Sequence, residues 1–215
     1  MKILFCHTGL STFVKSDLDF LKLHYDVTEY AYTVEKGKVM KIRNIFSSLF
    51  ISLKHVRRVD IVYGWFGGFH CFWAVLLAKI LNKKSIIIVG GYDASYIPSI
   101  RYGVFYNKGM LLWCVKKIYQ WATYICPVSE SVVRSTNYYA DPTGKGYKTG
   151  ILNHMELEES KIKVIPTGYD SEFWKPDFSI VREGVIALAS VTNDNTFVLK
   201  GFDLLVECAK MLPEI

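Results

Sequence analysis

Short apolar runs alternate with longer amphipathic stretches between Met1 and Pro166. The apolar runs are rich in Ile, Val and Phe, which is typical of buried strands, and we predict strands at 3–7, 25–32, 61–63, 85–89, 124–128 and 164–166. Helical spacing of apolar residues predicts helices at 16–23, with Ser16 as N-cap, and at 41–56, 72–81, 110–123 and 129–136. The alternation predicts an α/β fold: a Rossmann-like parallel sheet with helices on both faces.

The pattern changes after Pro176, where a polar connector precedes a predicted strand at 184–190 and a predicted helix at 201–212. We therefore expect two domains, a Rossmann-like domain at 1–180 and the opening strand and helix of a second at 181–215. The stretch 138–149 contains Pro142, Gly144 and Gly146, and we expect a mobile loop there.

One stretch, 61–78, contains no Lys, Arg, Asp or Glu and approaches the length of a membrane span. Gly64, Gly67, Gly68 and His70 interrupt it, which favours a strand, a glycine-rich turn and a buried helix. A membrane span is the alternative.

The composition narrows the class of partner. The net charge of +6 favours anionic partners without choosing among phosphates, acidic lipid and nucleic acid. The five cysteines show no CxxC spacing, so neither a zinc site nor a disulfide framework is indicated, and reduced thiols in a cytoplasmic protein are expected. Met1 leads directly into the first strand, which leaves no room for a signal peptide.

Ligands of open parallel sheets bind at the carboxyl ends of the strands, so the residues that follow each strand are the candidates for a site. The first strand is followed by no G-x-G-x-x-G, which disfavours a nucleotide-binding oxidoreductase. Each candidate also has a structural interpretation, as a tight turn, a core residue, an Asx-turn or a helix cap. The candidates are Gly9, Trp65, His70, Gly91, Tyr92, Asp93, Ser129 and Glu130.

Two stretches carry a family resemblance: KIKVIPTGYDSEFWKP at 161–176 and KGFDLLVECAKMLPE at 200–214. The first resembles the interdomain crossover of family-4 glycosyltransferases with the GT-B fold, and the second resembles the first helix of their donor-binding domain. The resemblance implies the acceptor-side half of an enzyme that moves a sugar from a nucleotide-sugar to a carbohydrate or lipid-linked acceptor. It also implies that the donor half is barely begun at Ile215.

The resemblance gives the candidates roles. Gly9 would face the donor phosphates, Trp65 and His70 would line the acceptor pocket, and Ser129 and Glu130 match a "VSE" segment. The turn Gly91–Tyr92–Asp93 matches an "HG.D" segment whose histidine falls on Gly90, which leaves Asp93 as the candidate catalytic base.

In the second domain, Lys200 would neutralise the donor diphosphate, although the upstream Arg of the family is replaced within Ser190–Asn193. We expect no metal and no cofactor, because in the family Lys and helix dipoles handle the diphosphate.

Two segments, 36–58 and 101–124, combine basic and aromatic residues. Such helices can lie on an anionic membrane, or they can pack on the sheet with solvated lysines. No nucleic-acid-binding module is recognisable and only the net charge would favour such a partner, so we expect no nucleic acid. The expected place is the cytoplasm, peripherally on the inner face of the membrane. The alternative function is a non-catalytic carbohydrate- or membrane-binding module of the same fold.

Overall fold

The computed structural model describes residues 1–33, 37–179, 181 and 184–211, with the backbone alone at 38–42. Its central sheet has five strands in the order β2-β1-β3-β4-β5, and every neighbouring pair is parallel. The strands are β1 (Lys2–His7), β2 (Asp26–Ala31), β3 (Ile61–Trp65), β4 (Lys84–Val89) and β5 (Tyr124–Pro127). The predicted Rossmann-like α/β fold is confirmed.

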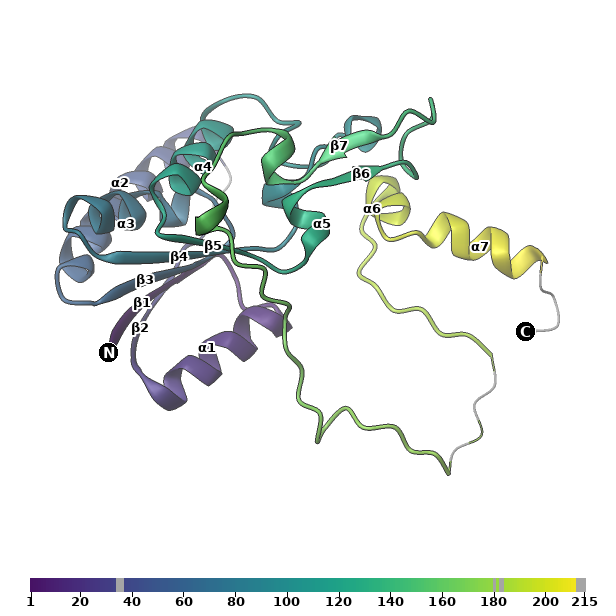
Figure 1. The fold of residues 1–215 in the computed structure, drawn as a ribbon, viewed down its shortest axis with the longest axis horizontal. Coiled ribbons are helices and arrows are strands. Elements are labelled where there is room, and N and C mark those ends of the chain that lie inside the picture. The colour runs from purple at the N-terminus through teal and green to yellow at the C-terminus, as the bar shows by residue number, and fades with distance from the viewer. Residues whose placement is uncertain (34–36, 180, 182–183, 212–215) are drawn as a thin grey trace.

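Helices cover both faces of the sheet (Figure 1). Helix α1 (Thr12–His24) lies on one face, and α2 (Lys38–Val56), α3 (Phe69–Ile80) and α4 (Met110–Trp121) lie on the other. The chain winds outward from β1 in both directions, so the strand order reverses between β1 and β3. This switch point, at the carboxyl ends of the strands, is where open α/β sheets bind ligands.

Side chains of successive strand residues enter two separate cores. Leu4 and Cys6 pack in the larger core beneath α2, α3 and α4, while Phe5 packs in the smaller core with Val14 and Leu18 of α1. Strands that are buried on both faces consist of continuous apolar runs, and for this reason these strands could be predicted from the sequence.

The uncharged stretch 61–78 is β3, a glycine-rich turn and most of α3. Helix α3 lies between α2 and α4, and its Ala74, Val75 and Ala78 are fully buried. Neighbours on three sides account for its hydrophobicity. Among the described residues, no helix combines the length and the apolar character that crossing a bilayer would need.

Helix α1 begins four residues earlier than predicted. Ser11 is its N-cap residue, whereas Ser16 is exposed within the helix, so the assignment of Ser16 as N-cap was wrong. The helix starts early because Val14 and Leu18, both buried, lie one turn apart on the face that packs against the sheet.

The region after β5 differs most from the prediction. The helix expected at 129–136 is only α5 (Glu130–Val133). Strand β6 (Ser135–Asn137) follows it and pairs in antiparallel fashion with β7 (Tyr147–Thr149), inside the expected mobile loop. Ser, Thr and Asn are weak helix formers, and their partners in β7 lie ten to fourteen residues further along the chain, beyond the span of a local pattern.

The predicted closing strand at 164–166 is not a regular strand, although the chain there runs beside β5. The amides of Lys163 and Ile165 donate to the carbonyls of Ile125 and Pro127, both at 2.9 Å. Four short 3₁₀ turns complete this domain: η1 (Tyr92–Ala94), η2 (Pro98–Ile100), η3 (Ile151–Asn153) and η4 (Glu159–Lys161).

Beyond Pro166 the described chain has no regular element until α6 (Asp194–Leu199) and α7 (Phe202–Met211). The strand predicted at 184–190 is absent, and Leu188 is 97% exposed. A strand needs a neighbour to receive its backbone hydrogen bonds, and this segment has none among the described residues. The division into domains at 180/181 stays a prediction. Leu212, the last residue of the predicted helix, lies outside the described residues.

Candidate functional site

The turns that follow β1, β3 and β4 meet at the switch point and enclose a cavity of about 440 Å³. Helices α2 and α4 supply its outer wall. The turns bring together three residues that the sequence marked as candidates, His70, Tyr92 and Asp93. The cavity is lined by Thr8, Tyr32, Asn44, Phe66, Gly67, Gly68, Phe69, His70, Tyr92, Asp93 and Leu111.

Asp93 holds the turns together. Its Oδ1 accepts the amides of Gly90 and Gly91 at 3.2 Å, and its Oδ2 accepts the amide of Gly67 at 2.9 Å and the Tyr119 hydroxyl at 3.0 Å. The side chain is 1% exposed, and burial raises the pKa of its carboxyl group, against the hydrogen bonds, which lower it. Both oxygens are therefore engaged by the protein itself. This arrangement favours a positioning role over the catalytic base suggested by the sequence.

Gly90, where the resemblance noted above would place a histidine, has no room for a side chain. A Cβ at position 90 would lie 2.3 Å from Cε1 of Phe66, so the Phe66 ring fills the space that a side chain there would need. Phe66 itself has a φ of 67°, a left-handed conformation that is rare for an aromatic residue and typical of constrained sites. The Phe66 ring thus forms an apolar part of the cavity wall.

His70 is the first-turn histidine of α3 and is 3% exposed. Its Nε2 lies 2.8 Å from the carbonyl oxygen of Trp65; a carbonyl only accepts, so Nε2 carries the proton. Burial lowers the pKa of His70 to about 4, which leaves the ring neutral at neutral pH. The histidine lines the cavity but is already satisfied by the backbone, as its structural interpretation expected.

Tyr92 is the most accessible polar candidate in this cavity. Its side chain is 40% exposed, and its hydroxyl accepts a hydrogen bond from Nδ2 of Asn107 at 2.9 Å, which leaves the hydroxyl proton available for a ligand. Thr8, in the exposed turn after β1, also lines this cavity and carries a hydroxyl. Gly9 follows it, exposed and with open space at the position of a Cβ.

Gly91 faces a second cavity, of about 480 Å³, on the other side of the same turn. Its φ of 140° is a conformation that only glycine adopts without strain. Opposite Gly91, the β6–β7 hairpin forms the wall of this cavity. The sequence prediction missed the hairpin. Its only signal was the run Ser135–Thr136–Asn137–Tyr138–Tyr139, in which hydroxyls, an amide and two tyrosines follow one another.

Ser129 and Glu130 lie at the start of α5. The Ser129 hydroxyl is 2.8 Å from that of Ser131, which lines the second cavity, and it makes no capping bond to the helix. Glu130 is exposed beside a shallow cavity with Arg134 and Lys163. Ser129 therefore lies next to the second cavity, and Glu130 lies on the neighbouring surface.

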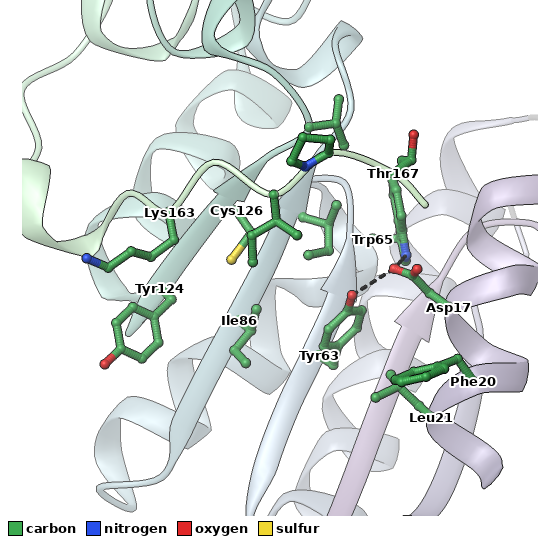
Figure 2. A pocket seen from close by; sticks show the side chains of 14 residues that line it. Asp17, Phe20, Leu21, Tyr63, Trp65, Ile86, Tyr124, Cys126, Lys163 and Thr167 are labelled. Atoms are coloured by element: carbon green, nitrogen blue, oxygen red, sulfur yellow. Dashed lines mark hydrogen bonds between the residues drawn. The ribbon is translucent and has the colours of Figure 1, made fainter. Parts of the chain in front are cut away.

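Trp65 is separated from the other candidates. Its side chain is 1% exposed and enters the core beneath α1, where its Nε1 donates to Oδ2 of Asp17 at 2.9 Å. The Tyr63 hydroxyl donates to the same oxygen at 2.8 Å (Figure 2). These residues line a third cavity, of about 480 Å³, on the sheet face next to α1. As placed, the Trp65 ring offers no face to the switch-point cavity, contrary to the stacking role expected from the sequence.

His7, the last residue of β1, was not among the candidates. Its Nε2 is 3.1 Å from Oε1 of Glu29, whose Oε2 accepts Lys22 Nζ at 2.8 Å. The hydrogen bond with Lys22 holds the pKa of Glu29 below its usual value. Nδ1 of His7 is buried and has no partner among the described residues. His7 thus ends a chain of polar contacts that ties α1 and β2 to β1.

Lys200, the predicted diphosphate ligand, is the exposed C-cap residue of α6. At the N-terminus of that helix, Asn193 and Thr196 form a capping box, so part of the segment that replaces the family's Arg serves to start the helix. The role of Lys200 stays a prediction. Within the described residues, no three His, Cys, Asp or Glu side chains gather as metal ligands.

Neither a protein-family model nor a curated protein matches the chain. Among solved structures, the crystal structure of Acinetobacter baumannii MurG is similar with a TM-score of 0.37 and 14% identity. The match covers 59% of this chain and 41% of that chain, so it spans less than half of MurG. At this level of similarity no inference about activity follows.

Proposed function

We propose that the chain is the acceptor-side part of a glycosyltransferase of the hexosyltransferase type, which moves a sugar from a nucleotide-sugar to a carbohydrate or lipid-linked acceptor. Synthesis of a glycan or cell-surface polysaccharide is the process it fits. The family resemblance of the crossover at 161–176 and of the segment at 200–214 suggests the activity. The observation that carries the proposal is the arrangement of the Gly91–Ala94 turn, which separates two cavities at the carboxyl edge of the sheet.

The residues around this turn suit a neutral, hydroxyl-rich substrate. Tyr92 and Thr8 offer hydroxyls, Phe66 offers an apolar wall, and His70 stays uncharged. In the transfer, the acceptor oxygen bonds to the anomeric carbon and the bond from that carbon to the diphosphate oxygen breaks. The electron pair leaves with the nucleoside diphosphate, whose oxygen can receive the acceptor's proton. We place Asp93 as the residue that holds the turn in shape for this step.

The donor diphosphate is proposed to bind Lys200, because charge developing on a leaving diphosphate requires a cation. A second domain beginning near residue 181 is proposed to supply the rest of the donor site. No metal or cofactor enters the proposed reaction.

An anionic membrane surface is proposed as a further partner, through the outer face of α2. This helix packs on the sheet with Ser48, Ser52 and Val56 and exposes Phe46 and Phe50, which are 57% and 69% accessible. The arrangement is unusual, because the larger apolar side chains face outward. Exposed basic residues accompany them: Arg43, Lys54, Arg57 and Arg58. Within the segment 36–58, Lys36 and the side chains of Lys38 and Lys41 lie outside the described residues.

A transfer assay tests the proposal. The intact gene product is incubated with radiolabelled UDP-, GDP- and ADP-sugars together with oligosaccharides and a bacterial lipid extract, and labelled products are separated by chromatography. A labelled product that falls with Tyr92→Phe supports the proposal. Retention of glycans without any labelled product would favour the alternative, a non-catalytic carbohydrate- or membrane-binding module of the same fold.

A further inference from the structure

We propose that the groove between the β6–β7 hairpin and the Gly91–Ile97 segment is a carbohydrate subsite, which binds the part of the acceptor glycan remote from the reacting hydroxyl. The inference rests on the proposed function in one respect, because calling the bound glycan an acceptor assumes a transferase. Binding of a neutral glycan in the groove does not depend on catalysis. The groove holds about 480 Å³ and is lined on one side by Ser135, Asn137 and Tyr138 and on the other by Gly91 and Ser95.

The groove is preformed, because the hairpin is bonded to the segment opposite it. The amide of Gly150 donates to the carbonyl of Ala94 at 2.9 Å, and the amide of Tyr96 donates to Oγ1 of Thr149 at 3.1 Å. The Ser99 hydroxyl donates to the carbonyl of Ala140 at 2.6 Å. A ligand therefore need not order the hairpin, which saves the entropy that flexible loops lose on binding.

The Asn153 side chain, from the η3 turn that follows β7, holds both strands of the hairpin. Its Nδ2 donates to the carbonyls of Ser135 and Thr149, at 3.0 and 2.6 Å. Gly150 follows β7 with a φ of 96°, and a Cβ there would lie 2.7 Å from the carbonyl oxygen of Val133. Close packing at this corner fixes the angle between the hairpin and α5.

Charge identifies the class of ligand. None of the thirteen residues that line the groove carries a charge, although the chain as a whole has a net charge of +6. A site for a phosphate, a diphosphate or a carboxylate would require cations or a ring of backbone amides. A neutral ligand is therefore favoured, and the abundance of side-chain hydroxyls favours one that carries hydroxyls.

The polar groups that remain available fit a polyol. Ser135 uses its proton on the carbonyl of Ser131 at 2.8 Å and keeps its lone pairs. The amide oxygen of Asn137 accepts Ala140 at 2.9 Å, and its NH₂ has no partner among the described residues. Tyr138 is 62% exposed and presents a ring as well as a hydroxyl. Donors, acceptors and an aromatic ring in one groove match the two aspects of a sugar, its hydroxyls and its CH faces.

The position of the groove explains why it would bind an acceptor with more than one sugar. Gly91 lines this groove, whereas Tyr92 and Asp93, the next two residues, line the switch-point cavity. A glycan passing over this single turn would touch both. The turn held by Asp93 then sets the orientation of one sugar unit relative to the next.

A glycan array tests the inference without any donor. The purified chain is applied to an array of neutral and acidic oligosaccharides, and affinities for retained glycans are measured by calorimetry. The variant Tyr138→Ala should bind neutral glycans about tenfold more weakly, and Asn137→Ala should do the same, because each removes a contact worth about 1.4 kcal/mol. Tyr25→Ala is the matched control, since Tyr25 is exposed at the α1–β2 junction and is absent from the lining of the groove.

Retention of only acidic glycans, retention of none, or equal loss in the control would overturn the inference. A melting temperature measured for each variant separates lost binding from lost folding. Glycan binding that depends on Tyr138 in a protein that gives no labelled transfer product would uphold the subsite and reject the transferase. If the variants at Tyr138 and Asn137 transfer sugar as the wild type does, with unchanged affinity and KM for the acceptor, the transferase would be upheld and the subsite rejected.

Discussion

The Tyr119 hydroxyl lies 3.0 Å from Oδ2 of Asp93 and 3.1 Å from the carbonyl oxygen of the same residue. Both side chains are buried, and burial raises the pKa of Tyr119 well above its usual value, so it acts as a hydroxyl donor. Helix α4 is thereby fastened to the turn that separates the two cavities. This contact sets the position of Tyr92 and Gly91.

Replacing Asp93 by Asn should destabilise the fold. An Asn NH₂ at the Oδ2 position could donate to Tyr119 but would face the amide proton of Gly67, and the reverse rotamer would face Gly90 and Gly91. A buried donor left without an acceptor costs about 1–3 kcal/mol. Urea unfolding measures the loss.

Asp170→Asn is the control for this prediction, because Asp170 is exposed and accepts the amides of Glu172 and Phe173 through one oxygen that Asn retains. A loss within about 0.5 kcal/mol is expected there. Equal stability of Asp93→Asn and wild type would show that the four hydrogen bonds do not matter to folding.

His70 should make stability depend on pH. Its pKa is lowered from 6.5 to about 4, chiefly by burial, so the unfolded chain takes up a proton that the folded protein refuses. The stabilisation is complete above pH 6.5 and is lost as the pH falls toward 4. From the difference of the two pKa values, His70 accounts for at most about 3 kcal/mol of this loss.

The variant His70→Gln, which does not titrate, isolates the effect. Its free energy of unfolding should fall less than that of the wild type between pH 7 and pH 4, as measured by urea titration at several pH values. Parallel curves for the two proteins would mean that the pKa of His70 is the same in the folded protein as in the unfolded chain.

Gly90→Ala should destabilise the protein by roughly 1–3 kcal/mol, as overpacking does, because the new Cβ would lie 2.3 Å from the Phe66 ring. The double variant Gly90→Ala, Phe66→Ala should lose less than the sum of the single variants, since removing the ring removes the clash. Thermal unfolding of the four proteins completes the cycle. Gly168→Ala, with open space around its Cβ, is the control, and additive losses in the cycle would contradict this packing.

Membrane docking through α2 should require its outward phenylalanines. Phe46→Ser together with Phe50→Ser should weaken binding to phosphatidylserine vesicles in co-sedimentation by about a hundredfold or more, because each buried apolar side chain contributes about 1.5–3 kcal/mol. Added salt should release the wild type, since basic residues near the surface contribute on the order of 1 kcal/mol each. Phe20→Ser on α1, where Phe20 is 60% exposed, is the matched control. Equal binding to neutral and anionic vesicles would exclude the electrostatic part of the mechanism.

The five-stranded parallel sheet and the helices α1 to α4 that cover it could be predicted from the sequence. A central strand such as β4 is covered on both faces of the sheet, so it forms a continuous apolar run that can be recognised in the sequence. The sequence also led to the turn Gly91–Tyr92–Asp93, because strand ends mark ligand sites in this class of fold. Strands and helices can be located in this way because each one shows its own apolar periodicity, without reference to distant residues.

The contacts of those residues, in contrast, could not be predicted from the sequence and are seen in the folded structure. Asp93 is a buried acceptor because Gly67 and Tyr119, 26 residues away on either side, converge on it, and Trp65 leaves the site because its indole reaches Asp17 on α1. The β6–β7 hairpin and its neutral groove likewise arise from pairing between Ser135 and Thr149 and from the bond between Gly150 and Ala94. Such roles depend on contacts between residues that are distant in the sequence, and these contacts cannot be inferred from the residues that neighbour a side chain along the chain.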